Sequence, residues 1–179
     1  MQAPLPRNQN SHPSPSSPSS LLSHVPVSSG SACVEFVCQK LPTILVEGDP
    51  YTFRWNPALA IKTAFLETED AFADTVELGN KSGCCGCLVL IRGSTLWAAN
   101  VGDCRAVIVR DSGKGVPLTN DHRASEKSEK ERIRAAGGTV KDGRVYGVLM
   151  PSRTIGDLQE KPSRNPNKKP VSVLLCTAC

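Results

Sequence analysis

The sequence predicts an α+β fold in which antiparallel strands are flanked by helices. Residues 57–73 repeat apolar side chains at helical spacing, and residues 128–136 show a second helical pattern. Between these two segments, short β-type runs are separated by turns. Such turns join antiparallel strands, because parallel strands need a crossover of a dozen or more residues. The length of 179 residues suffices for one domain.

The first segment, residues 1–30, is predicted to be a disordered tail. Residues 11–20 read SHPSPSSPSS, with six serines and three prolines. A segment of this composition buries too little apolar surface to offset its chain entropy. We also expect no signal peptide, because the first thirty residues carry one charged side chain, Arg7, and no long apolar run.

Two helices are predicted next, over 32–41 and 57–73. The first places Val34, Val37 and Leu41 at helical spacing, and residues 42–55, which are rich in proline and glycine, are expected to form a loop. Asn56-Pro57 is a typical helix start, because Asn caps free amides and Pro fits the first helical position. The acids of the second helix, among them Glu69, are expected to face solvent.

Three strands are predicted after Ser82, at Leu88–Ile91, Leu96–Val101 and Arg105–Val109. Turn-forming residues at 92–94 separate the first two strands, and a second turn signal at 111–114 follows the third. These short spacings indicate an antiparallel meander.

A helix and one further strand are predicted after the meander. Ser128 and Glu131 form a capping-box pattern, and Gly137-Gly138 should end the helix with a left-handed cap. Its alternating acids and bases, including Glu129, are expected to form a solvated face. Residues Arg144–Leu149 then read as a strand.

Composition excludes several classes of function. The net charge of +4, the pI near 8.7 and the 4% aromatic content are too weak to indicate nucleic-acid binding. No apolar run is long enough to span a membrane. We expect a monomer.

The eight cysteines are read as reduced thiols of a cytoplasmic or nuclear protein, because no export signal is seen. An alternative is a zinc site built from the pairs Cys84/Cys87 and Cys176/Cys179. The two pairs are far apart for a zinc ribbon, and the odd spacing of Cys84 and Cys87 near a strand points them to opposite faces.

Three phrases carry the strongest functional signal: ANVGDCRAV at 99–107, DHRASEKSEKERIRAAGG at 121–138 and GRVYGVLMPSRTIGD at 143–157. In this order they resemble the metal-dependent protein phosphatases of the protein phosphatase 2C (PPM-type) family. The resemblance implies an α-β-β-α sandwich, in which two antiparallel sheets pack face to face between helices. By this resemblance residues 31–161 form a partial PPM-type domain, and residues 162–179 form a divergent C-terminal tail.

The resemblance also implies an activity, the hydrolysis of phosphoserine and phosphothreonine in phosphorylated protein substrates with Mg²⁺ or Mn²⁺. Two such cations would activate a water molecule and neutralise charge on the phosphoryl oxygens. Asp103 is the acid that matches a family metal position, and aspartate suits these cations because they prefer oxygen ligands. No catalytic residue is assigned. Five signature residues are expected to be structural: Arg105, Asp121, His122, Arg153 and Asp157.

The sequence departs from the family pattern at both ends. VPVSS at 25–29 stands where the family carries a metal-binding DGHGG phrase, and the downstream DG(L/I)WD phrase and D-N pair are not found. We therefore expect a truncated chain with impaired hydrolysis. The alternatives are a non-catalytic pseudophosphatase that acts as an interaction module, and a fragment with little stable fold.

Overall fold

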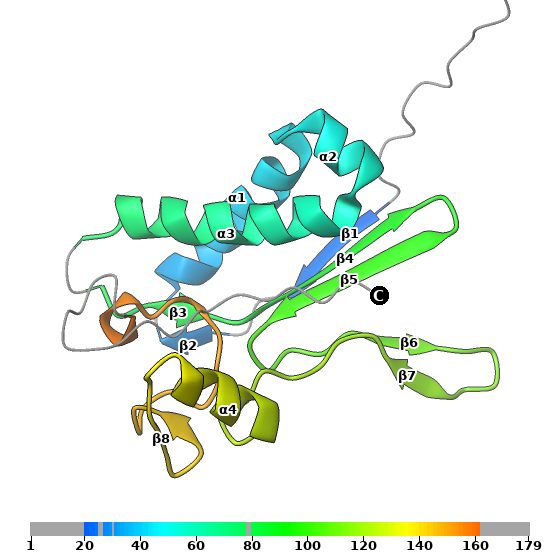
Figure 1. Ribbon diagram of the computed structural model, residues 1–179. Coiled ribbons are helices and arrows are strands. Elements are labelled where there is room, and N and C mark those ends of the chain that lie inside the picture. Colours follow the sequence, from blue (N-terminus) through cyan, green and yellow to red (C-terminus); the bar gives the residue numbers. More distant parts are fainter. Residues whose placement is uncertain (1–19, 25–26, 30, 78–79, 162–179) are drawn as a thin grey trace, which may run out of the picture.

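A computed structural model of the chain describes residues 20–24, 27–29, 31–77 and 80–161. Three consecutive helices cover one face of a three-stranded sheet, and a hairpin and a fourth helix lie below that sheet in the view of Figure 1. The helices are α1 (Ala32–Glu47), α2 (Pro50–Trp55), α3 (Pro57–Thr75) and α4 (Lys127–Ala135), and a 3₁₀ turn spans Leu158–Glu160. No helix among these residues is long and apolar enough to cross a membrane.

The strands form four small sheets. Their bounds are β1 (Ser20–His24), β2 (Val27–Ser29), β3 (Gly83–Cys84), β4 (Gly86–Arg92), β5 (Thr95–Val101), β6 (Val107–Val109), β7 (Gly115–Pro117), β8 (Val140–Lys141), β9 (Arg144–Val145) and β10 (Ile155–Gly156). The sheet orders are β1-β4-β5, β10-β3-β2, β6-β7 and β8-β9, and each of these pairings is antiparallel. The predicted α+β class with antiparallel sheets flanked by helices is confirmed.

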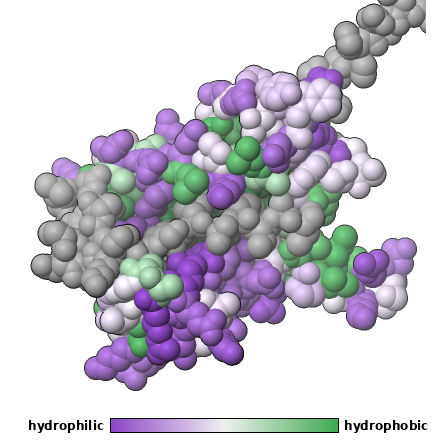
Figure 2. All heavy atoms as spheres, viewed as in Figure 1, coloured by the Kyte–Doolittle hydropathy of each residue, from purple (hydrophilic) through white to green (hydrophobic). Residues whose placement is uncertain are grey.

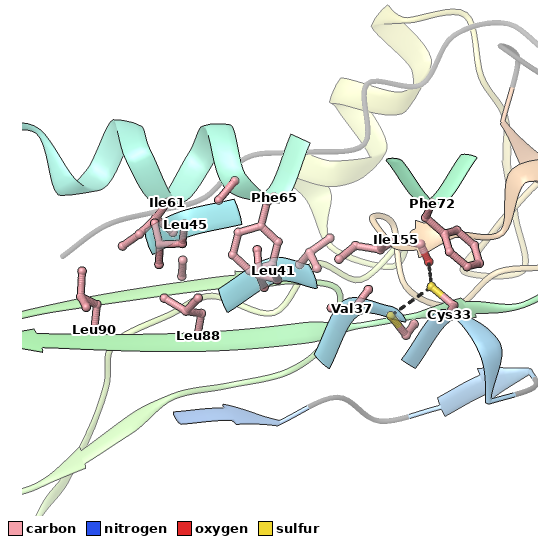
Figure 3. Packing of buried hydrophobic residues seen from close by; sticks show 14 residues of the cluster. Cys33, Val37, Leu41, Leu45, Ile61, Phe65, Phe72, Leu88, Leu90 and Ile155 are labelled. Carbon is pink, nitrogen blue, oxygen red and sulfur yellow. Dashed lines mark hydrogen bonds between the residues drawn. The ribbon is translucent and has the colours of Figure 1, made fainter. Parts of the chain in front are cut away.

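The main core lies between the helices and the sheet (Figure 3). Helix α1 contributes a stripe of residues one turn apart, and α3 and the strand β4 contribute the facing side chains. The buried members of this stripe and of the facing layer include Cys33, Val37, Leu41, Leu45, Ile61, Phe65, Phe72, Leu88 and Leu90. Alternate residues of β4 are buried because successive side chains of a strand point to opposite faces.

A second, smaller core fixes α4. Ala124, Ile133 and Val145 are buried together, and Leu149 packs against them. This cluster connects α4 to β9.

The hairpin β6–β7 stands apart from both cores. Val107, Ile108 and Val109 are all exposed, and Val109 exposes 68% of its surface. Figure 2 shows hydrophobic side chains gathered over this hairpin. The predicted three-strand meander is therefore wrong in one respect: β4 pairs with β5, whereas β6 pairs with β7.

Part of the predicted tail is ordered. Strand β1 pairs with β4 from Ser20↔Ile91 to His24↔Cys87, and β2 pairs with β3. The prediction of disorder over 1–30 is wrong for these two strands, because edge pairing with β4 and β3 satisfies their backbone groups. Residues 1–19, 25–26 and 30 lie outside the described residues, as does the predicted tail 162–179.

The predicted loop at 42–55 is wrong. Helix α1 continues through Pro42 to Glu47, because the buried stripe extends to Leu45 and offsets one lost hydrogen bond. Helix α2 then begins at Pro50, where the Asp49 side chain accepts from the amides of Tyr51 and Thr52. By contrast, the helix predicted from Asn56-Pro57 is confirmed and ends two residues later than expected.

The capping box predicted for α4 is also wrong. The N-cap residue is Glu126, and Ser128 lies inside the helix. The C-terminal end matches the prediction, since Gly137 is left-handed with a φ of 78° and the Gly138 amide donates to the carbonyl of Ile133.

Two predicted strands are shorter in the structure. The third strand of the meander begins at Val107 rather than Arg105. The strand predicted over Arg144–Leu149 ends at Val145, because Tyr146 takes a positive φ of 52° and turns the chain.

Candidate functional site

Asp103 lies in the turn that follows β5. Its Oδ1 accepts from the Cys85 thiol at 3.5 Å, and its Oδ2 lies 3.7 Å from Nε of Arg123. The turn requires Gly102, because a Cβ there would lie 2.1 Å from the Cys85 sulfur and φ is +87°. The carboxylate of Asp103 is thus held between a thiol and a guanidinium, with 27% of the side chain exposed.

Asp121 lies beside Asp103 and shares its cation. Nη2 of Arg123 is 3.5 Å from Asp121 Oδ2, while Arg105 donates from Nε to Asp121 Oδ1 at 2.8 Å. The four charged groups thus follow the order Arg105, Asp121, Arg123, Asp103, so each neighbouring pair has opposite charges and the net charge of the four is zero. We name these four residues, Asp103, Arg105, Asp121 and Arg123, the Asp103 cluster.

His122 connects the Asp103 cluster to the second core through its backbone. Its amide donates to the carbonyl of Gly102 at 2.8 Å, and its carbonyl accepts from the amide of Ser152 at 2.9 Å. The ring is buried, and burial together with the nearby Arg153 lowers the pKa of His122 to about 4. The imidazole is therefore neutral near pH 7.

Glu129 is the centre of a buried ionic network that the sequence did not predict. Arg153 donates from Nε at 2.9 Å, Arg132 donates from Nη2 at 2.8 Å, and the Ser152 hydroxyl donates as well. Burial alone would raise the pKa of Glu129, but these hydrogen bonds outweigh it and hold that pKa well below its usual range.

The expected solvated face of α4 is thus wrong at Glu129. Glu129 precedes the buried Ile133 by four residues and lies on the same face of the helix. This spacing of four residues is the one sequence pattern that could have predicted that Glu129 is buried. The partner Arg153 comes from a segment 24 residues away, and no local pattern identifies it.

Asp157 lies in a third, separate group of charges. It is buried, takes a positive φ of 49°, and its carboxyl carbon would lie 2.2 Å from a Cβ added at Gly83. Burial raises the pKa of Asp157, although a hydrogen bond with Thr154 lowers it. The tight approach to Gly83 ties Asp157 to strand β3.

Glu69 and Lys161 form an ion pair near Asp157. Glu69 accepts from the amide of Gly156 at 2.8 Å and from Nζ of Lys161 at 2.5 Å, and Lys161 also donates to the carbonyl of Thr154 at 2.9 Å. The expectation that Glu69 faces solvent is therefore wrong. The pair joins α3 to the segment after β10.

A family model described as Protein phosphatase 2C matches residues 4–174. The chain belongs to the protein phosphatase 2C family. Probable protein phosphatase 2C 57 of Oryza sativa subsp. japonica is 39% identical over 130 residues, which are 72% of this chain and 35% of that protein. Protein phosphatase 2C homolog 3 of Schizosaccharomyces pombe is 39% identical over 149 residues, with 81% and 35% covered. The chain spans about a third of the length of these relatives.

Solved structures show the same fold. A phosphatase from a pathogenic strain of Toxoplasma gondii superposes with a TM-score of 0.70 at 20% identity, over 88% of this chain and 63% of that chain. A C. elegans sex determining protein also gives 0.70, at 22% identity, over 89% of this chain and 39% of that chain. The protein phosphatase 2C fold is thus present over most of the chain.

The carboxylates of this family member do not fit a two-metal centre. All 17 acidic side chains lie in the ranges that the structure describes. Within those ranges no group of three His, Cys, Asp or Glu side chains could hold a metal ion. Asp121 is the neighbouring acid of Asp103, but both carboxylates are paired with the guanidinium of Arg123. Glu129 and Asp157 belong to other groups of charges.

The zinc alternative gains no support from the described cysteines. Cys84 is buried in the main core beside Cys33, and Cys87 is half-buried on the next strand. Cys176 and Cys179 lie outside the described residues. The six cysteines within the described ranges are free thiols, as the sequence predicts.

Proposed function

We propose that this chain is a phosphatase-2C-type domain that recognises phosphoserine or phosphothreonine proteins and hydrolyses them weakly at most. The family assignment supports the substrate class. The observation that supports the impairment is the ion pair between Asp103 and Arg123, whose Nε lies 3.7 Å from the carboxylate that is expected to bind a metal.

The charge of the Asp103 cluster supports this proposal. A divalent cation that approached Asp103 would face the guanidinium of Arg123 as well as the carboxylate, and like charges at short range repel. Mg²⁺ or Mn²⁺ remains the cofactor that the family implies. The acids described above are instead divided among three groups: Asp103 with Asp121, Glu129, and Glu69 with Asp157.

The alternative is a non-catalytic interaction module, and a specific observation favours it. The buried network around Glu129 and the pair Glu69–Lys161 both join distant segments. These contacts stabilise the folded domain and do not involve Asp103. Binding without turnover is therefore the second function that we propose, for a monomer in the cytoplasm or nucleus.

The first prediction concerns hydrolysis. Purified chain should release little phosphate from a phosphothreonine peptide, with or without Mn²⁺, because Asp103 alone cannot hold a two-metal cluster. Phosphate release is measured beside the variant Asp103→Ala, and a thermal melt confirms that both proteins are folded. Mn²⁺-dependent turnover that disappears in Asp103→Ala would contradict the proposed impairment. Binding of the peptide without turnover would support the interaction module.

A further inference from the structure

Two buried cysteines meet where α1, β3 and β10 come together (Figure 3). Cys33, which is labelled in Figure 3, lies in the first turn of α1. Cys84 lies in β3, and both residues are fully buried. Their sulfur atoms are 3.3 Å apart, and the Cys33 sulfur also lies 3.3 Å from the carbonyl oxygen of Ile155. The two residues are 51 positions apart in the chain.

The contacts of Cys33 favour one arrangement of the two thiol protons. Cys33 has one S–H proton, and the carbonyl of Ile155 can only accept, so this proton points to Ile155. In this arrangement Cys84 donates its proton to the Cys33 sulfur. The hydrogen bond with Cys33 and burial raise the pKa of Cys84. A proton donated by Cys84 would stabilise negative charge on the Cys33 sulfur, so we take Cys33 as the first nucleophile.

We propose that Cys33 and Cys84 are an oxidation site that closes to a reversible disulfide when the protein meets hydrogen peroxide. A disulfide has an S–S length of about 2.05 Å, so the sulfurs need to approach by roughly 1.2 Å. A side-chain rotation and a small shift at the end of α1 supply a movement of this size.

The reaction balances in two steps. The Cys33 thiolate attacks one oxygen of the peroxide, the O–O bond breaks, and hydroxide leaves and takes up a proton to give water. Cys33 is then a sulfenic acid. The Cys84 sulfur attacks the Cys33 sulfur, the S–S bond forms, and the second oxygen leaves as water. Two thiols are oxidised and one peroxide is reduced to two water molecules.

Peroxide reaches the pair through the end of α1. Ser31 is the N-cap residue of α1, yet its side chain makes no capping hydrogen bond. A helix end without a side-chain cap opens locally more readily than a capped end. Cys33 is two residues from that end, so a local opening of the first turn uncovers its sulfur.

The disulfide would join α1 to β3 across a long loop. A bridge of this kind removes conformational freedom from the unfolded chain, and the effect grows with loop length. The oxidised protein should therefore melt at a temperature about 5 °C or more above that of the reduced protein.

The experiment uses the full chain, treated with hydrogen peroxide, blocked with N-ethylmaleimide and mapped by tandem mass spectrometry of tryptic peptides. We expect a cross-linked peptide that joins Cys33 to Cys84, together with a rise in Tm that dithiothreitol reverses. Cys38→Ser, on the same helix, and Cys85→Ser, next to Cys84, should keep the link. Cys33→Ser and Cys84→Ser should each lose the link and the rise in Tm.

Two results would overturn the proposal. One is a wild-type map in which the thiols of Cys33 and Cys84 are alkylated or over-oxidised and no link forms between them. The other is a rise in Tm on oxidation that persists in Cys33→Ser, or a wild-type map in which a link between Cys85 and Cys104, which also contact each other, forms in place of the Cys33–Cys84 link. The wild-type map decides the question even if a buried variant fails to fold.

Discussion

Glu129 carries its charge in a site that exposes about 5% of the residue. A charge in such a site is stable only when it is paired and its oxygen atoms accept hydrogen bonds. Arg153, Arg132 and Ser152 provide that pairing, and they connect α4 to the segment before β10. At the residue scale, the signature Arg153 therefore acts on the fold through Glu129.

Replacing Glu129 tests this network. Glu129→Gln removes the negative charge and leaves the guanidinium of Arg153 buried, so the free energy of unfolding should fall by about 3 kcal/mol. Urea denaturation followed by circular dichroism measures this change. The matched control is Glu131→Gln on the exposed face of the same helix, which should change stability by less than about 0.5 kcal/mol. Equal effects from the two substitutions would show that the network contributes nothing to stability.

His122 predicts how stability depends on pH. Its folded pKa is about 4, below the model-peptide value of 6.5, so the unfolded chain binds a proton first as the pH falls. Stability from this residue is complete above pH 6.5 and is lost between pH 6.5 and pH 4, by about 1–2 kcal/mol at pH 5. Buried Asp157, whose pKa is raised, has the opposite effect, because its protonation stabilises the folded state as the pH falls.

The measurement therefore compares two proteins. The urea midpoint should shift less between pH 7.5 and pH 5 in His122→Gln than in the wild type. An identical shift in both proteins would refute this role for His122.

At the element scale, the strands β3 and β10 are too short to be stabilised by many ladder hydrogen bonds. A close contact between Gly83 and Asp157 positions them. Each has two residues, and their pairing places Gly83 opposite Gly156. The absence of a side chain at Gly83 makes room for the carboxyl group of Asp157. The turn after β10 thus depends on one glycine in β3.

Gly83→Ala tests this contact. The added Cβ would lie 2.2 Å from the Asp157 carboxyl carbon, so strand β3 or the turn must shift, and stability should fall by about 1–3 kcal/mol. Gly86→Ala in β4 is the control, because its Cβ would meet Val101 at an ordinary 3.5 Å. Differential scanning calorimetry of the two variants should show a lower Tm for Gly83→Ala only. The idea fails if the two variants melt together.

Short sequence patterns predicted the elements that are determined by neighbouring residues. Asn56-Pro57 caps α3, and the turn at Gly93 joins β4 to β5. The same kind of signal was present at Asp49-Pro50 and was not recognised, so α2 was missed. Strands β1, β2, β3 and β10 could not be predicted because their pairing partners are distant in sequence, and two-residue strands carry no periodicity.

For the candidate site, the motifs identified residues but not their partners. The phrases at 99–107 and 121–138 predicted Asp103, Arg105, Asp121 and His122, and the structure brings all four together. The contact between Asp103 and Asp121 runs through Arg123, which lies in the second phrase but was not singled out. Whether Asp103 binds a metal in this chain stays a prediction.

At the scale of the whole molecule, the chain has the fold of its family and a charge distribution that supports stability. Two packed cores and three groups of paired charges account for a folded unit. A fragment with little stable fold, one of the alternatives that the sequence left open, would instead show no cooperative melt. We expect one cooperative transition.

The most direct test of this account is a calorimetric titration of the full chain with Mn²⁺ at pH 7.5. We predict no saturable binding below about 1 mM, because the carboxylates that would hold the ion are paired with arginine and lysine. Asp103→Ala should give the same result. Tight binding of two Mn²⁺ ions per chain, lost in Asp103→Ala, would contradict the central claim that the acids of this chain form no two-metal centre.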